Sequence, residues 1–253
     1  MIDRQKRRKV PEKLPFLNLL PNIITMLGLF AGLTAIRFVF AERYEAAAGL
    51  IILAALLDGL DGQIARRMKA TSDIGAELDS LSDFLNFGVA PALLSFQYLL
   101  RGAPDIGWIF VLVYVSCCCL RLARFNVMQD AEPDPGVKKS THFIGVPAPA
   151  GALLMLLPAF MSFEGFLDLA SIPVVPAVYI ALVGAAMVSR LPTFSPKSIL
   201  VPKDKIVWIL IAAAGIVGMM LTRFWLSMIL IDLIYAATLV RSAVLLRRTR
   251  SSS

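Results

Sequence analysis

The chain has 253 residues, of which 58% are hydrophobic, and a formal net charge of +7. Soluble domains are usually about 45–50% apolar, so this composition, with a mean hydropathy of +0.74, indicates an integral membrane protein and excludes a soluble nucleic-acid-binding domain. We expect an all-α fold, a polytopic helical bundle with about eight transmembrane helices. The expected spans are residues 16–40, 45–66, 79–100, 106–128, 147–163, 172–189, 205–222 and 224–246.

The positive charges predict how the chain is oriented. If the N-terminus is cytoplasmic, 21 of the 25 Lys and Arg residues fall on the cytoplasmic side of these spans, as the positive-inside rule requires. We therefore predict a protein of the cytoplasmic (inner) membrane with both termini and the active site on the cytoplasmic side. The expected regions are a basic N-terminal segment (1–15), a single transmembrane domain (16–246) and a basic tail (247–253).

The second predicted span contains acidic residues in an unusual setting. Asp58, Asp61, Gly62, Ala65 and Arg66 follow the spacing i, i+3, i+4, i+7, i+8 and so lie on one face of a helix. Acids within a membrane span are costly and are functional by default. These two aspartates therefore mark a candidate site at the cytoplasmic end of the span.

The next span carries a second acidic face. Gly75, Asp79 and Asp83 are spaced by four residues and share one side of a helix, whereas Glu77 lies off that side and is expected to be solvated. If the two helices face each other, four carboxylates converge. Such hard oxygen ligands favour magnesium, manganese or calcium.

The same residues suggest a type of chemistry. Two divalent ions about 3.5–4 Å apart can clamp a diphosphate and stabilise a departing phosphate. Gly62 and Ala65 leave room for a ligand against the helix, and the Arg66 guanidinium matches phosphate geometry. A carboxylate at the rim could take a proton from an attacking hydroxyl. The pattern therefore predicts phosphoryl-group transfer from a diphosphate donor at the membrane surface.

Residues 58–83 match the pattern D-x2-D-G-x2-A-R-x8-G-x3-D-x3-D at every fixed position, and this resembles the CDP-alcohol phosphotransferase family of membrane enzymes. The resemblance implies transfer of a substituted phosphate from a CDP-linked lipid or alcohol to an acceptor hydroxyl, with release of CMP. It implies two Mg²⁺ or Mn²⁺ ions as cofactors. The implied metal ligands are Asp58, Asp61, Asp79 and Asp83, with Asp61 bridging and Asp83 also the general base. The implied CDP-binding residues are Gly62, Ala65, Arg66 and Gly75, with Asn22 and Thr25 of the first span.

Three further segments are similar to the members of this family that use L-serine as the acceptor. They are RLARFN (121–126), FIGVPAPAGA (143–152) and MVSRLPTFSPK (187–197). The residues expected to bind the acceptor or its phosphate are Arg121, Arg124, Asn126, Lys138 and Arg190. The expected partners are CDP-diacylglycerol, L-serine, membrane lipid and a second copy of the chain in a homodimer, with no nucleic acid.

Alternatives remain open at this point. The enzyme could use choline, glycerol 3-phosphate or an inositol as the acceptor, and a divalent-cation carrier would also place acids in the membrane, although Gly62, Ala65 and Arg66 would have no role in it. Arg121 and Arg124 could be topology charges only. Gly28 and Gly32 have a spacing typical of helix packing. Asp232, alone in the last span, is expected to pair internally rather than to bind metal.

Overall fold

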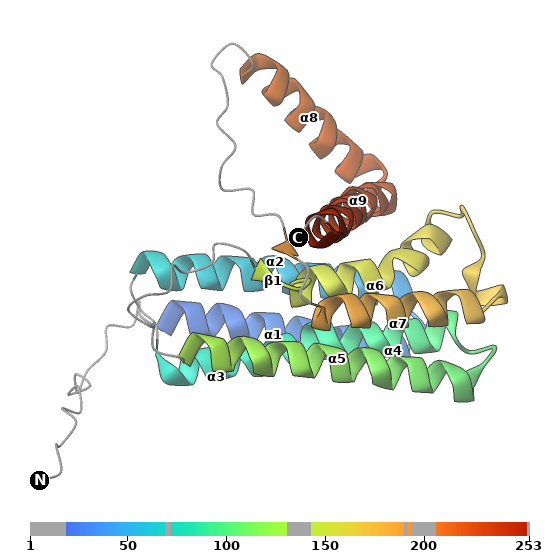
Figure 1. The fold of residues 1–253 in the computed structure, drawn as a ribbon, viewed down its shortest axis with the longest axis horizontal. Helices are drawn as coiled ribbons and strands as arrows, with labels where there is room; N and C mark the ends of the chain where they lie inside the picture. The colour runs from blue at the N-terminus through green and yellow to red at the C-terminus, as the bar shows by residue number, and fades with distance from the viewer. Residues whose placement is uncertain (1–18, 69–71, 131–142, 190–191, 194–205, 252–253) are drawn as a thin grey trace, which may run out of the picture.

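The protein is an all-α bundle, described by a computed structural model for residues 19–68, 72–130, 143–189, 192–193 and 206–251 (Figure 1). The α-helices are α1 (Leu20–Phe40), α2 (Tyr44–Met68), α3 (Asp73–Asp83), α4 (Ala90–Leu99), α5 (Pro104–Asp130), α6 (Ala148–Phe163), α7 (Val174–Val188), α8 (Ile206–Thr222) and α9 (Phe224–Ser251). A π-helix, η2 (Phe84–Val89), joins α3 to α4, and a 3₁₀ turn, η3 (Leu169–Ser171), precedes α7.

Each predicted span coincides with one helical segment, so the predicted fold class is confirmed. Four helices among the described residues are long and apolar enough to cross a membrane, namely α1, α2, α5 and the Phe224–Val244 part of α9. Helices α6 and α7 are shorter but equally apolar. The third predicted span is composite, because α3, η2 and α4 follow one another without a break between residues 73 and 99.

Helices α1 and α2 run antiparallel and pack closely along their length (Figure 1). The buried face of α1 is made of small residues, including Gly28, Ala31, Gly32 and Ala35. Small side chains allow helix backbones to approach closely in a membrane. This close approach brings the beginning of α1 against the end of α2, where the predicted acidic face lies.

Helix α3 begins at a side-chain cap. Ser72 lies just before the helix in an extended conformation, and its hydroxyl accepts a hydrogen bond of 3.1 Å from the Gly75 amide. Serine is a preferred residue at this position because it satisfies a free N–H group of the first turn. The cap fixes the start of α3 directly after the 69–71 connection from α2.

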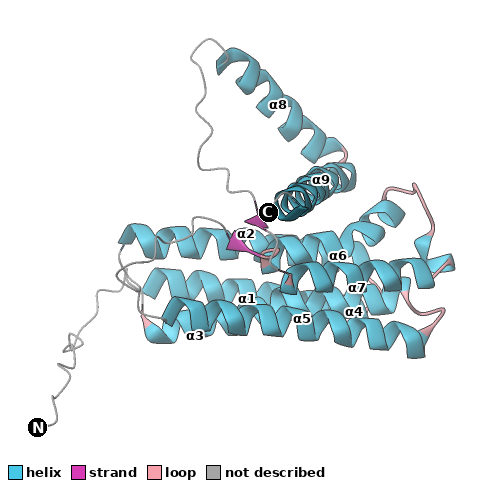
Figure 2. Cartoon of the chain, in the orientation of Figure 1, coloured by secondary structure: helices cyan, strands magenta, loops and turns pink. Residues whose placement is uncertain are grey.

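A two-residue strand pair holds the middle of the chain together. Strands β1 (Phe143–Ile144) and β2 (Pro192–Thr193) pair antiparallel, shown in magenta in Figure 2. β1 precedes α6 and β2 follows α7, so α6 begins and α7 ends beside this strand pair. Helix α9 packs against α6 and lies next to β2, and α8 packs on α9 and projects away from the other helices (Figure 1).

The end of the bundle opposite the acidic faces carries paired charges. Arg101 forms an ion pair of 2.7 Å with Glu42, and Arg223 forms one of 2.9 Å with Glu164. These two arginines belong to the four Lys and Arg residues that the predicted orientation leaves outside the cytoplasm; the other two are Arg37 and Arg43. Since each has an acidic partner, this end contributes little net positive charge.

Candidate active site

The structure brings three of the four predicted carboxylates together. One oxygen atom from each of Asp58, Asp61 and Asp79 lies within 4.8 Å of the other two, so these residues could hold a metal ion. Asp58 and Asp61 come from the last turns of α2, and Asp79 comes from the middle of α3. The two acidic faces, each predicted from the spacing within one helix, therefore lie toward each other in the structure.

Asp61 is the most firmly held of the three. Its side chain is only 4% exposed. The Thr25 hydroxyl of α1 lies 2.7 Å from Asp61 Oδ2 and 3.1 Å from the Pro21 carbonyl oxygen. A hydroxyl has one proton to donate, and the shorter contact is with Asp61. Thr25, which was predicted to bind CDP, thus also orients a predicted metal ligand.

Asp83 adjoins the three-carboxylate group and contacts Asp58. It is the last residue of α3, where the helix changes to the π-helix η2. Its carboxyl is close enough to interact electrostatically with those of Asp58 and Asp79 and with the Arg121 guanidinium of α5. A carboxylate with a cationic neighbour, set beside the other acids, is well placed to act on a substrate group rather than only on a metal.

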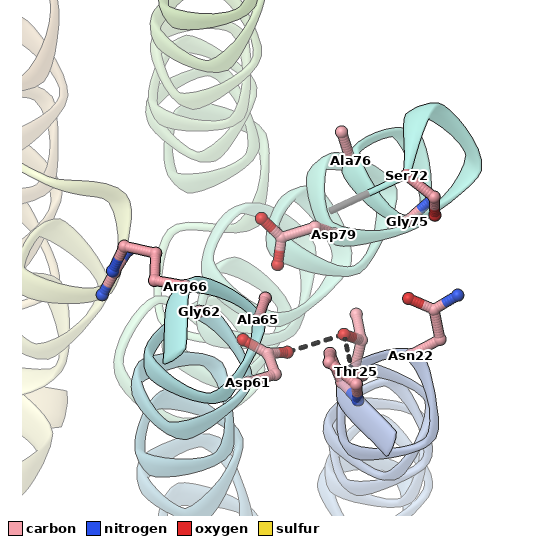
Figure 3. A pocket seen from close by; sticks show the side chains of 11 residues that line it. Asn22, Thr25, Asp61, Gly62, Ala65, Arg66, Ser72, Gly75, Ala76 and Asp79 are labelled. Atoms are coloured by element: carbon pink, nitrogen blue, oxygen red, sulfur yellow. Dashed lines mark hydrogen bonds between the residues drawn. The ribbon is translucent and has the colours of Figure 1, made fainter. Parts of the chain in front are cut away.

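A cavity of about 340 Å³ opens beside the carboxylates, between the ends of α1, α2 and α3 (Figure 3). This volume lies within the range of small-molecule pockets. The cavity is lined by Asp61, Asp79 and all six residues predicted to bind CDP. These six residues are Asn22, Thr25, Gly62, Ala65, Arg66 and Gly75. Residues that are far apart in the sequence thus share one concave surface next to the acidic group.

Two positions show how the cavity keeps its shape. A Cβ atom added to Gly75 would lie 2.8 Å from Asn22 Oδ1, so any larger residue would press on the facing side chain. Arg66 is exposed, and its guanidinium lies over Gly62 and extends away from Asn22 and Thr25 (Figure 3). Arg66 forms no hydrogen bond or ion pair with the described residues, which leaves its donors free for a ligand.

The residues predicted to bind the acceptor fall into four groups. Arg121 is half-buried and donates a hydrogen bond from Nε to the Val146 carbonyl, which holds it beside Asp83. Asn126 instead donates a hydrogen bond of 3.0 Å from Nδ2 to the Ser80 hydroxyl and ties α5 to α3. Arg124 is half-buried without a hydrogen bond or ion pair to the described residues. Lys138 and Arg190 lie outside the described residues.

The sequence did not single out Asn86, which lies in η2 and is 2% exposed. Its amide nitrogen donates to the Ser82 hydroxyl at 3.1 Å, and that hydroxyl lies 3.5 Å from the Thr25 carbonyl oxygen. Asn86 therefore connects the π-helix to the residue that orients Asp61. The available signal was a lone asparagine within an apolar run, and π-helical segments occur frequently at functional sites.

Gly32 has a more specific role than its GxxxG spacing suggested. A Cβ atom there would overlap the Asn86 amide oxygen and lie 2.8 Å from Leu85 Cδ2. We expect Gly32→Ala to lower the free energy of unfolding by about 1–3 kcal/mol, as overpacking does, and to reduce activity because α1 carries Thr25.

Gly49→Ala is the matched control, since nothing lies within 4 Å of a Cβ atom at Gly49. An alanine in an open helix position is neutral or stabilising. Thermal unfolding of the two variants in the same detergent would separate them. Equal melting temperatures would contradict the assigned contact between Gly32 and Asn86.

Asp232 is buried in α9, and its Oδ2 atom makes no hydrogen bond with the described residues. The expected internal pairing is therefore not seen for this oxygen atom. The metal-binding group found among the described residues does not include it.

Comparisons with known proteins agree with this site. The family model for CDP-alcohol phosphatidyltransferase matches residues 18–189, which contain the cavity and all four aspartates. A Mycobacterium bovis protein named CDP-diacylglycerol–serine O-phosphatidyltransferase is 49% identical over 140 residues, covering 55% of this chain and 48% of that protein. The chain spans about half the length of the mycobacterial relatives that it matches.

Two more distant relatives carry the same name and are covered more fully. The Helicobacter pylori protein is 34% identical over 180 residues, covering 70% of this chain and 73% of that protein. The Methanocaldococcus jannaschii protein is 36% identical over 168 residues, covering 66% and 70%. Since the family model matches more than half of the chain, this protein belongs to the CDP-alcohol phosphatidyltransferase family.

Proposed function

We propose that the protein transfers the phosphatidyl group of CDP-diacylglycerol to the hydroxyl of L-serine, forming phosphatidylserine and CMP. The observation that carries this proposal is the cavity lined by the predicted CDP-binding residues, directly beside the carboxylate group. The names of the relatives from Mycobacterium, Helicobacter and Methanocaldococcus support serine as the acceptor.

In this proposal the carboxylates hold divalent cations. Asp58, Asp61 and Asp79 supply hard oxygen ligands on two facing helices, and no described basic side chain forms an ion pair with them. This donor set fits Mg²⁺ or Mn²⁺, and we propose two such ions with Asp61 as the bridging ligand. When bound, they would neutralise the diphosphate of the donor and the phosphate of the departing CMP.

The chain's own residues then bind and orient the substrates. The nucleotide lies against Gly62 and Ala65, with Asn22 and Thr25 across the cavity and Arg66 donating to a phosphate. Asp83 takes the proton of the serine hydroxyl, and the resulting oxygen attacks the phosphorus that carries diacylglycerol. The bond from this phosphorus to the bridging oxygen of the diphosphate breaks, and CMP leaves with that oxygen. Arg121, held beside Asp83 by Val146, binds the serine carboxylate.

An acceptor screen tests this proposal. Purified protein in detergent receives CDP-diacylglycerol and Mn²⁺ with serine, choline, glycerol 3-phosphate or inositol, and the lipid product is identified by mass. We expect phosphatidylserine from serine alone. A different lipid product would assign another acceptor within the family, and no CMP release with any acceptor would reject the transferase activity.

The proposal includes the cytoplasmic orientation of the site and a homodimer. For orientation, we expect a cysteine replacing the exposed Glu77 to resist a membrane-impermeant thiol reagent in sealed cells, and one replacing the exposed Asp105 to react. Cys117, Cys118 and Cys119 are first replaced by alanine. The reverse labelling pattern would contradict the orientation.

The homodimer is tested separately. Full activity of a monomer in detergent would contradict the need for a dimer.

A further inference from the structure

Tyr235 is a half-buried residue that the proposed mechanism does not use. It lies on α9, which packs against α6 and beside β2 and falls outside the region matched by the family model. Its hydroxyl is buried and has no hydrogen-bond partner among the described residues. Buried polar groups are nearly always hydrogen-bonded, so an exception in a native structure calls for a specific reason.

The charged neighbour of this hydroxyl is Arg121. The Tyr235 side chain is close enough to interact electrostatically with the Arg121 guanidinium. Arg121 in turn interacts with Asp83, the proposed base. Tyr235 therefore approaches Arg121 from a helix that packs against α6, which begins two residues after Val146.

The hydrogen bonds of Arg121 leave donors available at this place. Its Nε–H group donates to the Val146 carbonyl, which fixes the plane of the guanidinium. The Nη groups make no hydrogen bond to the described residues, so they can donate to a ligand. Neither Arg121 nor Tyr235 lines the cavity assigned to CDP. The two side chains thus face a different part of the site from the nucleotide.

We propose that Tyr235 is an acceptor-binding residue, whose hydroxyl donates a hydrogen bond to the acceptor's carboxylate beside Arg121. This inference rests on the proposed function, because it assumes an acceptor that carries a carboxylate next to its reacting hydroxyl. A guanidinium and a neutral hydroxyl together provide several donors for one carboxylate. Helix α9 would then complete the acceptor pocket of a site whose nucleotide-binding part lies entirely within α1 to α3.

Tyr44 provides a matched control. Its hydroxyl is also buried without a hydrogen-bond partner among the described residues. It lies at the far end of the bundle, where the nearby Arg101 is already paired with Glu42. Both tyrosine hydroxyls thus lack a partner among the described residues, but only Tyr235 interacts with the arginine that neighbours Asp83.

The test compares Tyr235→Phe with Tyr44→Phe, each of which removes one oxygen atom and keeps the ring. We expect Tyr235→Phe to raise the KM for serine about 10-fold or more, since a hydrogen bond to a charged group is lost. The KM for CDP-diacylglycerol and the affinity for CMP should stay unchanged, which also shows that the site is intact. Tyr44→Phe should leave all three values unchanged.

The outcomes separate this inference from the proposed function. If the wild-type protein makes phosphatidylserine and Tyr235→Phe keeps the wild-type KM for serine within about twofold, Tyr235 does not bind the acceptor. An equal rise in the KM for CDP-diacylglycerol would mean that the residue acts on the fold of the whole site, which also overturns the inference. If the wild-type protein makes no phosphatidylserine, the proposed function and this inference both fail.

Discussion

Replacing Asp61 by asparagine should lower kcat at least about 100-fold, because Asp61 is the most buried member of the three-carboxylate group. It is buried, it lies on the cavity wall, and it shares the three-carboxylate cluster with Asp58 and Asp79. Mutation of a residue that only supports a metal ligand already costs about 10- to 100-fold. In the proposed arrangement Asp61 would be shared by two cations, so its loss should cost more, since both ions would be affected.

Metal titration makes this prediction specific. Chelation should abolish turnover by the wild-type protein, and added Mg²⁺ or Mn²⁺ should restore it, whereas Asp61→Asn should need a much higher metal concentration. Glu77→Gln is the matched control, because Glu77 is an exposed acid on α3 only two residues from Asp79 and outside the metal-binding group. Full wild-type activity in excess chelator would contradict the assignment of the carboxylates as metal ligands.

Replacing Asp83 by asparagine should lower kcat by about 100- to 10,000-fold, the range that a general base contributes. The amide cannot accept the hydroxyl proton, although it keeps nearly the same shape. Asp83 lies at the edge of the three-carboxylate group and does not line the CDP cavity. The affinity for CMP, measured by calorimetry in the presence of metal, should therefore change much less than kcat.

Asp232→Asn is the control for this variant. Asp232 is another carboxylate buried in the bundle, but it lies on α9 outside the metal-binding group, and its Oδ2 atom has no partner among the described residues. Removal of an unpaired buried charge should not lower stability. If both variants lost activity equally, or if Asp83→Asn lost CMP binding in parallel with kcat, Asp83 would not be the base.

Much of the fold could be predicted because hydropathy and helical spacing are local properties of the sequence. The eight apolar segments became helices within a few residues of the expected limits. The spacing of i, i+3 and i+4 put the acids on one face of each helix, and the structure brings the faces carrying Asp58, Asp61 and Asp79 together. The cavity residues of α2 and α3 could be predicted for the same reason, since they occupy the same helical faces as the acids.

Other parts of the site depend on contacts between distant segments. The π-helix at 84–89 follows from packing against α1, where Gly32 leaves room for Asn86, and no local pattern indicates it. Asp83, at the junction between α3 and this π-helix, was expected to converge with the other three acids, and its carboxyl contacts that of Asp58 and interacts with that of Asp79. The contact of Arg121 with Val146 joins residues 25 positions apart, and Tyr235 approaches Arg121 from a helix more than 100 residues later. Spacing along one helix carries no information about such pairs.

The most direct test of the proposed reaction follows the oxygen atom of the serine hydroxyl. Purified protein with CDP-diacylglycerol, Mn²⁺ and L-serine labelled with ¹⁸O in its hydroxyl should form phosphatidylserine and CMP in equal amounts. Attack by that oxygen on the lipid-bearing phosphorus predicts one ¹⁸O atom in every phosphatidylserine molecule and none in CMP. Phosphatidylserine without the label, label in the nucleotide product, or CMP release without a serine-containing lipid would contradict the reaction assigned to this site.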